Sequence, residues 1–266
     1  MHTSKNFTRR DFLKFSAVSL CGACLAACAR VSDAPPAETY LRDNRQKLLT
    51  DFDAVLNPVR QLVVDLTGDQ DATAILKESR AAYETLLPQV PYIGGDDNSL
   101  TEVLYMSAIA LAFYQTMFAH GQSLEESGRI FYRAMETLFD GLLDPLDVAQ
   151  SGDPNGKTAQ DEFRRMARWS EKSPYPGDWK LAFVEGSADF DFGVDYTECG
   201  LLKFYKAQKA AELAPYLCLG DFPQSQLMNT GLARTTTLAH GGPRCDFRFK
   251  TGRPIQMEWI PEFLKE

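Results

Sequence analysis

The sequence predicts an α+β fold, in which an N-terminal helical bundle packs with a small antiparallel β-sheet that carries inserted helices in the C-terminal third. Three observations support this class. Apolar residues recur at intervals of three and four along residues 40–66 and 71–87, which is typical of helices with one buried face. After about residue 175, short runs rich in aromatic and β-branched residues indicate strands. Helices followed by strands favour α+β over an alternating α/β fold.

Prolines divide the first part of the predicted bundle. Pro58 lies inside the periodic segment 40–66. Because proline lacks the amide proton that a helix interior needs, we expect it to kink this helix or split it in two. Pro88 and Pro91 follow the segment 71–87 and end the second helix.

The next two helices are expected to begin at a serine that stands three residues before a glutamate. Ser99 precedes Glu102, and Ser123 precedes Glu126. At this spacing the hydroxyl and the carboxylate each accept an amide proton at the start of a helix, an arrangement known as a capping box.

The segment Val103–Ala119 carries no charged residue. It includes Ser, Gln and Thr, and its length lies at or below the range that spans a bilayer. Of the two interpretations, a membrane span and the buried central helix of the bundle, we favour the buried helix. His120 follows before Gly121 and is expected to end the helix rather than to act as a ligand.

The remaining chain changes from helical to mixed patterns. In order, we expect a loop over 144–157, an amphipathic helix over 158–172, a β-hairpin from 179–186 and 190–197, helices over 199–211 and 212–219, and a second hairpin over 231–250. The second hairpin is expected to turn at Gly241 and Gly242.

The first 28 residues resemble an export signal rather than part of the fold. Residues 8–14, Thr-Arg-Arg-Asp-Phe-Leu-Lys, resemble a twin-arginine signal and precede an apolar run. The run ends in Leu-Ala-Ala-Cys, which resembles a bacterial lipoprotein box, so Cys28 is the expected lipidation site. The alternatives are a plain signal peptide cut after a small residue and an uncleaved anchor. Cys21 and Cys24 would leave with the signal.

The expected organisation is a signal peptide over 1–27, a tether over 28–40 and a single α+β domain over 41–266. This domain is mainly helical to 174 and contains hairpins, helices and the cysteine site from 175 onward. The signal implies passage through the twin-arginine export machinery into the bacterial cell envelope. Lipid on Cys28 would then anchor the protein to a membrane, facing the periplasm or the cell exterior, since two acyl chains suffice for stable attachment.

Charge argues against a nucleic-acid partner. The chain has a net charge of −8, and residues 1–27 carry four basic side chains against one acidic one, so the remainder is near −11. No cluster of Lys and Arg after Lys14 offers a surface for phosphates.

Three cysteines follow the predicted signal and tether, all in the last third: Cys199, Cys218 and Cys245. The polar residues near them in the chain are Asp195, Glu198, Asp221, His240, Arg244 and Asp246. A thiolate is reactive at neutral pH when a base or cation lies beside it, and His240 and Arg234 are candidates. The residues alone leave other interpretations open. These are three buried apolar side chains, a zinc site, which would need closely spaced pairs, and a Cys199–Cys218 disulfide.

Four separated blocks in the last third are distinctive. They are YPGDWKLAFVEG from Tyr175, FDFGVDYTECGLLKFYK from Phe190, ELAPYLCLGDFP from Glu212 and RTTTLAHGGPRCDFRFK from Arg234. In this order they resemble the C-terminal region of the L-2-amino-thiazoline-4-carboxylic acid hydrolase family. In the family an acid more often stands at His240, where this chain therefore departs from the pattern.

The resemblance implies a hydrolase of cyclic amidine carbon–nitrogen bonds that converts a small-molecule substrate, a thiazoline, to an N-carbamoyl cysteine. No cofactor and no metal is expected. The site that the resemblance implies contains Cys199, Cys218, Asp221 and Cys245, and His240 is added as a candidate from its position in the sequence. A thiolate of Cys199 or Cys245 is expected to attack the ring carbon, with Asp221 or His240 as acid and base.

Arg234 is expected to bind the substrate carboxylate, since guanidinium and carboxylate match as a two-pronged pair; an exposed strand arginine is the alternative. A different class of function also fits the sequence. In that interpretation the protein is an exported lipoprotein that binds a small ligand or a metal with the same residues and has no catalytic activity.

Overall fold

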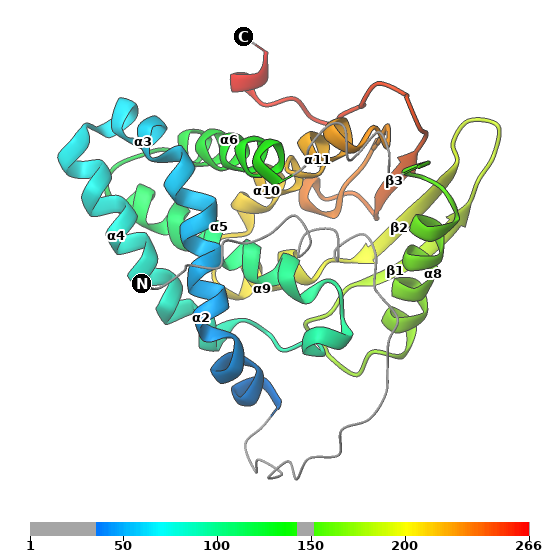
Figure 1. The fold of residues 1–266 in the computed structure, drawn as a ribbon, viewed down its shortest axis with the longest axis horizontal. Coiled ribbons are helices and arrows are strands. Elements are labelled where there is room, and N and C mark those ends of the chain that lie inside the picture. The colour runs from blue at the N-terminus through cyan, green and yellow to red at the C-terminus, as the bar shows by residue number, and fades with distance from the viewer. Residues whose placement is uncertain (1–35, 143–151, 266) are drawn as a thin grey trace, which may run out of the picture.

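The computed structural model describes residues 36–142 and 152–265 and has the predicted α+β architecture (Figure 1). The helices are α2 (Pro36–Leu56), α3 (Arg60–Thr67), α4 (Asp69–Leu86), α5 (Thr101–Ala119), α6 (Leu124–Leu142), α8 (Lys157–Lys172), α9 (Gly200–Ala207), α10 (Ala214–Cys218) and α11 (Asp221–Met228). The strands are β1 (Lys180–Glu185), β2 (Phe192–Glu198) and β3 (Cys245–Phe249). The predicted signal peptide, Cys28 and the loop residues 144–151 lie outside the described residues.

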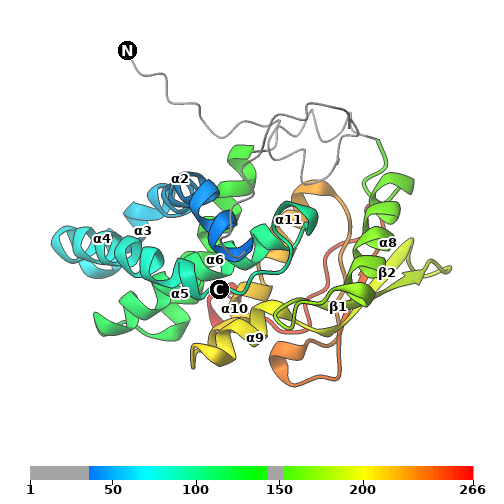
Figure 2. The same ribbon diagram turned by 90° about the horizontal axis from the view of Figure 1, so that it is seen from below.

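The N-terminal helices and the sheet lie on opposite sides of the molecule. In Figure 1, α2 to α6 form the left-hand side and the sheet with α8 the right-hand side, with the short helices α9, α10 and α11 between them. Figure 2 shows the same division from below. Buried side chains from both sides form one continuous hydrophobic cluster.

Pro58 splits the first predicted helix, as expected. A single 3-10 turn, Asn57–Val59, separates α2 from α3. The α2 face that turns inward carries Leu48, Leu49, Phe52, Val55 and Leu56. Helix α2 already begins at Pro36, so residues 36–40 of the predicted tether are helical.

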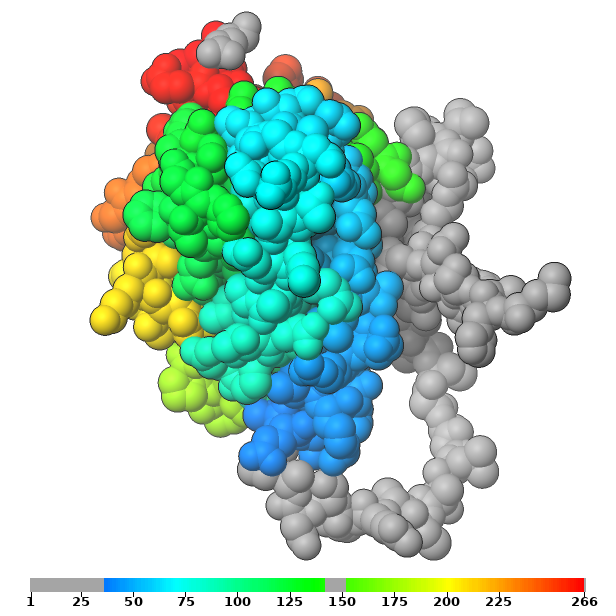
Figure 3. All heavy atoms as spheres, turned by 90° about the vertical axis from the view of Figure 1, so that its left-hand side faces the viewer, coloured from blue at the N-terminus to red at the C-terminus, as the bar shows by residue number. Residues whose placement is uncertain are grey.

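Helix α5 is the buried centre of the bundle, as predicted. It contacts α2, α4, α6 and α9, and most of its residues are buried. Figure 3, viewed from the side away from the sheet, shows that face built from the N-terminal helices in blue, cyan and green. Among the described residues, α5 has the length and apolarity to cross a membrane, but most of its residues are buried inside the protein.

The predicted capping box at Ser99 is wrong. Helix α5 starts after Leu100, and no side chain caps it. The Asn98 side-chain oxygen instead accepts the Leu100 N–H at 3.0 Å, and the Ser99 hydroxyl faces Arg165. His120 ends α5 as expected, and its Nε2 lies 2.9 Å from a Glu78 carboxylate oxygen.

The capping box at Ser123 is confirmed. The Glu126 carboxylate accepts the Ser123 N–H at 2.7 Å, and the Ser123 hydroxyl accepts the Glu126 N–H at 3.2 Å. Further along α6, Gly128 lies directly beneath the ring of Tyr216 on α10; a Cβ atom on Gly128 would lie 2.1 Å from that ring. The missing side chain thus lets α10 lie against α6.

The first predicted hairpin is confirmed. Strands β1 and β2 pair antiparallel, β2 pairs with β3, and the order is β1-β2-β3. Phenylalanines cover the face toward α8, where the ring of Phe192 stacks on Phe249 at 4.7 Å and on Phe183 at 5.7 Å. The Phe163 ring from α8 packs against both Phe192 and Phe249.

The second predicted hairpin is only half correct. Its second arm is β3, but the first arm joins β3 through the single bridge Ala233↔Arg248, and residues Leu238–His240 form a 3-10 turn before Gly241. The ladder is replaced because the Asp246 carboxylate accepts the N–H groups of Thr235 and Thr236, both at 2.8 Å. Helix α11, which follows Cys218, was not predicted.

Candidate functional site

The fold brings the three cysteines to the junction between the sheet and the short helices. Cys199 follows β2 and caps the N-terminus of α9, Cys218 ends α10, and Cys245 begins β3, paired with Tyr196 of β2. All three are free thiols, so the structure does not contain the Cys199–Cys218 disulfide that the sequence left open as an alternative. Cys245 is buried, whereas Cys199 and Cys218 are half-buried.

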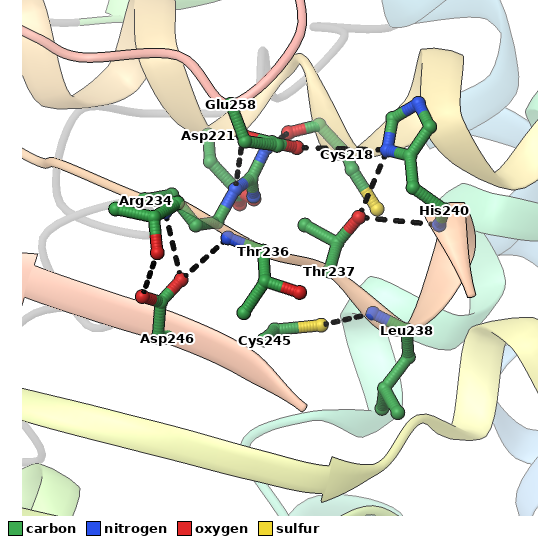
Figure 4. A network of polar contacts seen from close by, with 11 residues as sticks. Cys218, Asp221, Arg234, Thr236, Thr237, Leu238, His240, Cys245, Asp246 and Glu258 are labelled. Atoms are coloured by element: carbon green, nitrogen blue, oxygen red, sulfur yellow. Dashed lines mark hydrogen bonds and ion pairs between the residues drawn. The ribbon is translucent and has the colours of Figure 1, made fainter. Parts of the chain in front are cut away.

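The thiols lie close enough to one another, and to Asp221, to interact electrostatically. Negative charge on Cys199, Cys245 or Asp221 raises the pKa of Cys218, and the Arg234 charge opposes this effect. Figure 4 shows Cys218, Asp221, Arg234 and Cys245 around the segment Thr236–Leu238. The structure therefore brings together residues from α10, from α11, from the segment before Thr237 and from β3.

Burial is the largest influence on each thiol. It raises the pKa of Cys199, raises that of Cys218 further, and raises that of Cys245 to about 12. In the unliganded protein these groups are therefore thiols at neutral pH. Cys199 has the most groups that favour its thiolate, because the amides of Leu201 and Leu202 and the Trp179 indole donate toward its sulfur.

Arg234 lies at the centre of a buried ion-pair cluster. Its Nη1 donates to Asp221 at 2.6 Å, and its Nε and Nη2 donate to the two carboxylate oxygens of Glu258 at 2.9 and 3.0 Å. A fourth hydrogen bond reaches the Cys218 carbonyl at 3.1 Å. The side chain is 1% exposed, so the alternative of an exposed strand arginine is wrong.

Two aromatic rings complete the surroundings of this guanidinium. Its central carbon lies 4.6 Å from the Phe222 ring centroid and 5.0 Å from that of Phe247. Cation–π attraction adds to the ion pairs. Arg234 is therefore held by protein groups on its edges and on its faces.

Asp221 differs from the other members of the cluster because solvent reaches it. Its side chain is 39% exposed although one carboxylate oxygen contacts Arg234. Burial nevertheless raises the pKa of Asp221, and the Arg234 charge counteracts this. The Asp221 carboxylate is thus strongly desolvated and still in contact with solvent. Cys199 and Cys218 have the same combination.

His240 lies at the edge of this cluster. Its Nδ1 is 3.0 Å from the Thr237 hydroxyl and 4.0 Å from a Glu258 carboxylate oxygen, and its ring centroid is 5.1 Å from that of Trp259. Its side chain is 34% exposed. The imidazole thus faces Thr237 and Glu258.

The other polar residues singled out near the cysteines have structural partners. Asp195 pairs with Arg244 and Arg248 across the sheet, and Glu198 pairs with Lys203 of α9. Asp246 binds the segment before Thr237, as described above. Within residues 36–142 and 152–265, no three His, Cys, Asp or Glu side chains gather as a set of metal ligands.

Sequence reasoning missed Glu258, Trp179 and Tyr196. Burial raises the pKa of Tyr196, and nearby negative charge on Asp221, Cys245 or Cys199 raises it further, so this phenol belongs to the same cluster. Its position opposite Cys245 follows from the β2–β3 register. No local pattern marks Glu258, since its contact with Arg234 depends on the bridge between Gln256 and Ala233.

Comparison with known proteins identifies the family. No curated protein and no solved structure matches the chain. A family model, L-2-amino-thiazoline-4-carboxylic acid hydrolase, matches residues 102–249, more than half of the chain, and includes every candidate residue discussed above except Glu258 and Trp259. The chain, with its thiol, carboxylate and arginine cluster inside the matched region, therefore belongs to the L-2-amino-thiazoline-4-carboxylic acid hydrolase family.

Proposed function

We propose that the protein is a hydrolase that opens the ring of a 2-aminothiazoline carboxylate, and that Asp221 and Cys199 are its catalytic residues. The observation that carries this proposal is Asp221 itself: a carboxylate fixed by a buried arginine, reached by solvent, and within electrostatic range of three thiols. Membership in the family supports the substrate class.

The protonated substrate is an amidinium, a planar cation with N–H groups on the two nitrogens bound to its central carbon. A carboxylate oxygen accepts charge-assisted hydrogen bonds from such N–H groups, as it does from guanidinium. Asp221 has one oxygen engaged with Arg234 and keeps solvent contact. In this proposal Asp221 binds the amidinium and places its central carbon beside the thiols.

The ring opens in two steps in this proposal. Cys199 Sγ adds to the amidine carbon, the ring carbon–sulfur bond breaks, and the thiol proton passes to the departing ring sulfur. Water then adds to the isothiourea carbon, the carbon–Sγ bond breaks, and one water proton restores the Cys199 thiol. The product is an N-carbamoyl cysteine. Formation of this product breaks the ring carbon–sulfur bond. The bond cleaved in this proposal is therefore carbon–sulfur and not the carbon–nitrogen bond expected from the sequence.

Cys199 is the preferred nucleophile among the three cysteines. It is half-buried rather than buried, and N–H donors from α9 and Trp179 favour its thiolate. Because its pKa is raised in the free protein, a base has to take the thiol proton as the substrate binds. Asp221 and His240 are the candidate bases. Arg234, whose donors are already used by the protein, fits a positioning role toward Asp221 better than the substrate contact expected from the sequence.

Serine variants test the covalent step. We expect Cys199→Ser to lower the rate of thiazoline opening by about a hundredfold or more, and Cys245→Ser, whose sulfur is buried, to retain most of the rate. Mass spectrometry of N-carbamoyl cysteine gives the rate, and acid-quenched parent enzyme should carry an adduct of the substrate's mass on the Cys199 peptide. If both variants open the ring at the parent rate, covalent catalysis by Cys199 and by Cys245 is excluded.

The raised pKa values of all three thiols favour one alternative, binding of a cyclic amidine without turnover. Calorimetry with 2-amino-2-thiazoline, read beside the product assay, distinguishes such a binding protein from a hydrolase. A binder would take up the amidine and release no N-carbamoyl cysteine from the carboxylated substrate. Turnover by the full chain, lost in Cys199→Ser, excludes this alternative.

We also propose that the protein works on the outer side of a bacterial membrane, exported by the twin-arginine route and anchored by lipid on Cys28. The sequence of residues 8–14 and 25–28 supports this location. Detergent-phase partitioning tests it: the parent should partition with membrane lipoproteins, and Cys28→Ala should not. A change of Arg9 and Arg10 to Lys should retain the protein in the cytoplasm.

A further inference from the structure

We infer that Glu258, in the C-terminal segment beyond the family match, is a positioning residue of the site that fixes Arg234 so that Asp221 keeps an oxygen free for the substrate. This inference rests on the proposed function, because the substrate contact of Asp221 is part of that proposal. Glu258 itself contacts Arg234, and its side chain is 5% exposed.

Arg234 contacts its two carboxylate partners in different ways. Arg234 meets Glu258 with Nε and Nη2, at 2.9 and 3.0 Å, in a two-pronged contact, and meets Asp221 with Nη1 alone at 2.6 Å. A guanidinium prefers the two-pronged contact with a carboxylate. Because Glu258 occupies that edge, Asp221 is left with a single contact to Arg234.

Backbone hydrogen bonds place Glu258 beside Arg234. The Arg234 N–H donates to the Gln256 carbonyl at 3.0 Å, and the Gln256 N–H donates to the Leu232 carbonyl at 2.9 Å. This parallel bridge aligns the C-terminal segment with the chain that carries Arg234. Next to Glu258, the Trp259 ring packs at 5.1 Å against both Tyr216 and His240. Figure 1 shows the segment running from β3 back toward α6.

The net charge of Arg234, Asp221 and Glu258 also supports this role. The cluster holds one guanidinium against two carboxylates, which leaves an excess negative charge that suits a cationic amidinium. The Glu258 charge also contributes to the raised pKa of Asp221. Removing it would lower that pKa and would release Arg234 to bind Asp221 through both nitrogens.

The test compares Glu258→Gln with Glu262→Gln in the full chain. The two substitutions are chemically the same, but Glu262 is 78% exposed on the same segment and pairs only with Lys265 among the described contacts. We expect Glu258→Gln to lower the rate of thiazoline opening by about ten- to a hundredfold and to move the acid limb of the pH–rate profile to lower pH. Glu262→Gln should match the parent.

A second readout works without turnover. With Glu258 neutralised, the Arg234 charge is less compensated and should lower the pKa of Cys218, so iodoacetamide should alkylate Cys218 faster while Cys199 keeps its parent rate. A general loosening of the fold would accelerate the alkylation of both Cys218 and Cys199. The inference is overturned if Glu258→Gln keeps the parent's acid limb and the parent's Cys218 rate. A parent that opens no thiazoline refutes the proposed function alone, and the alkylation rates then decide the role of Glu258.

Discussion

Asp246 shows how one buried side chain replaces part of a strand ladder. Its carboxylate accepts the N–H groups of Thr235 and Thr236 and the Thr235 hydroxyl, at 2.6 to 2.8 Å. These bonds give the segment before Thr237 its path, and with it the placement of Arg234 and His240 on either side. A residue that a sequence pattern suggests for chemistry thus has an architectural role.

The acid dependence of stability follows from this carboxylate. Burial raises the pKa of Asp246, but the bonds from Thr235 and Thr236 outweigh it and hold the pKa below the usual 3.8. A depressed pKa contributes stability that is present above 3.8 and is lost as the pH falls through the lower value. We expect Asp246→Asn to lower the free energy of unfolding at pH 7 by about 1–3 kcal/mol.

Urea unfolding of both proteins at pH 7 and at pH 3 measures this effect. The difference between parent and variant should narrow at the lower pH, because at pH 3 the Asp246 carboxyl of the unfolded chain is protonated and part of the stabilisation is lost. A difference that stays constant between the two pH values would contradict the assigned role.

Thiol reactivity provides a second prediction at the residue scale. Because burial raises the pKa of Cys245 to about 12 from 9.0, little of it is thiolate at pH 8. We expect iodoacetamide to alkylate Cys199, Cys218 and Cys245 at least about tenfold more slowly in the folded chain than in urea. Peptide-resolved mass spectrometry gives each rate. Equal rates at Cys245 in the two conditions would show that its sulfur is not buried.

At the scale of elements, the contact between α6 and α10 depends on a missing side chain. The ring of Tyr216 rests on Gly128, its hydroxyl contacts Glu125, and Trp259 packs against its edge at 5.1 Å. Because the ring has partners on these sides, it has little freedom to move away from a new methyl group. The same ring connects α10, which ends in Cys218, to the segment that carries Glu258.

Alanine substitutions on α6 test this contact with a matched control. Gly128→Ala should lower the free energy of unfolding by about 1–3 kcal/mol, since overpacking forces the ring or the helix to shift. Gly141→Ala, on the same helix with open space around it, should leave stability unchanged or raise it by up to about 1 kcal/mol. Urea midpoints measure both, and a Gly128→Ala protein as stable as Gly141→Ala would argue against close α6–α10 packing.

At the scale of the whole molecule, periodicity predicted most of the architecture. The break at Pro58, the buried α5 and the first hairpin follow from local patterns, because each depends on residues close together in the chain. The second hairpin failed because the Asp246 side chain, rather than a backbone ladder, binds its first arm. The resemblance to the family pointed to the cysteines and to Asp221. The role of Glu258 could not be predicted, because its contact with Arg234 depends on how the chain folds over a longer distance.

Cooperativity tests whether this architecture is a single domain. The three tryptophans, Trp169, Trp179 and Trp259, all lie in the C-terminal half, whereas far-ultraviolet dichroism reports mainly on the helices. Because buried side chains of both halves form one cluster, we expect the two signals to change at the same urea concentration. Separate transitions would indicate two independently folding parts.

The apolar character of α5 bears on the export route that we propose. In the folded protein most of the helix is covered by its neighbours, although Phe118 is 66% exposed. In an unfolded chain threaded through a translocation channel, the same stretch would have the length and apolarity of a stop-transfer segment and would partition into the bilayer. A route that transports folded proteins, as the arginine pair in residues 8–14 implies, never presents this helix to lipid. Folding before translocation would then be required by the buried helix α5 as well as by the export signal.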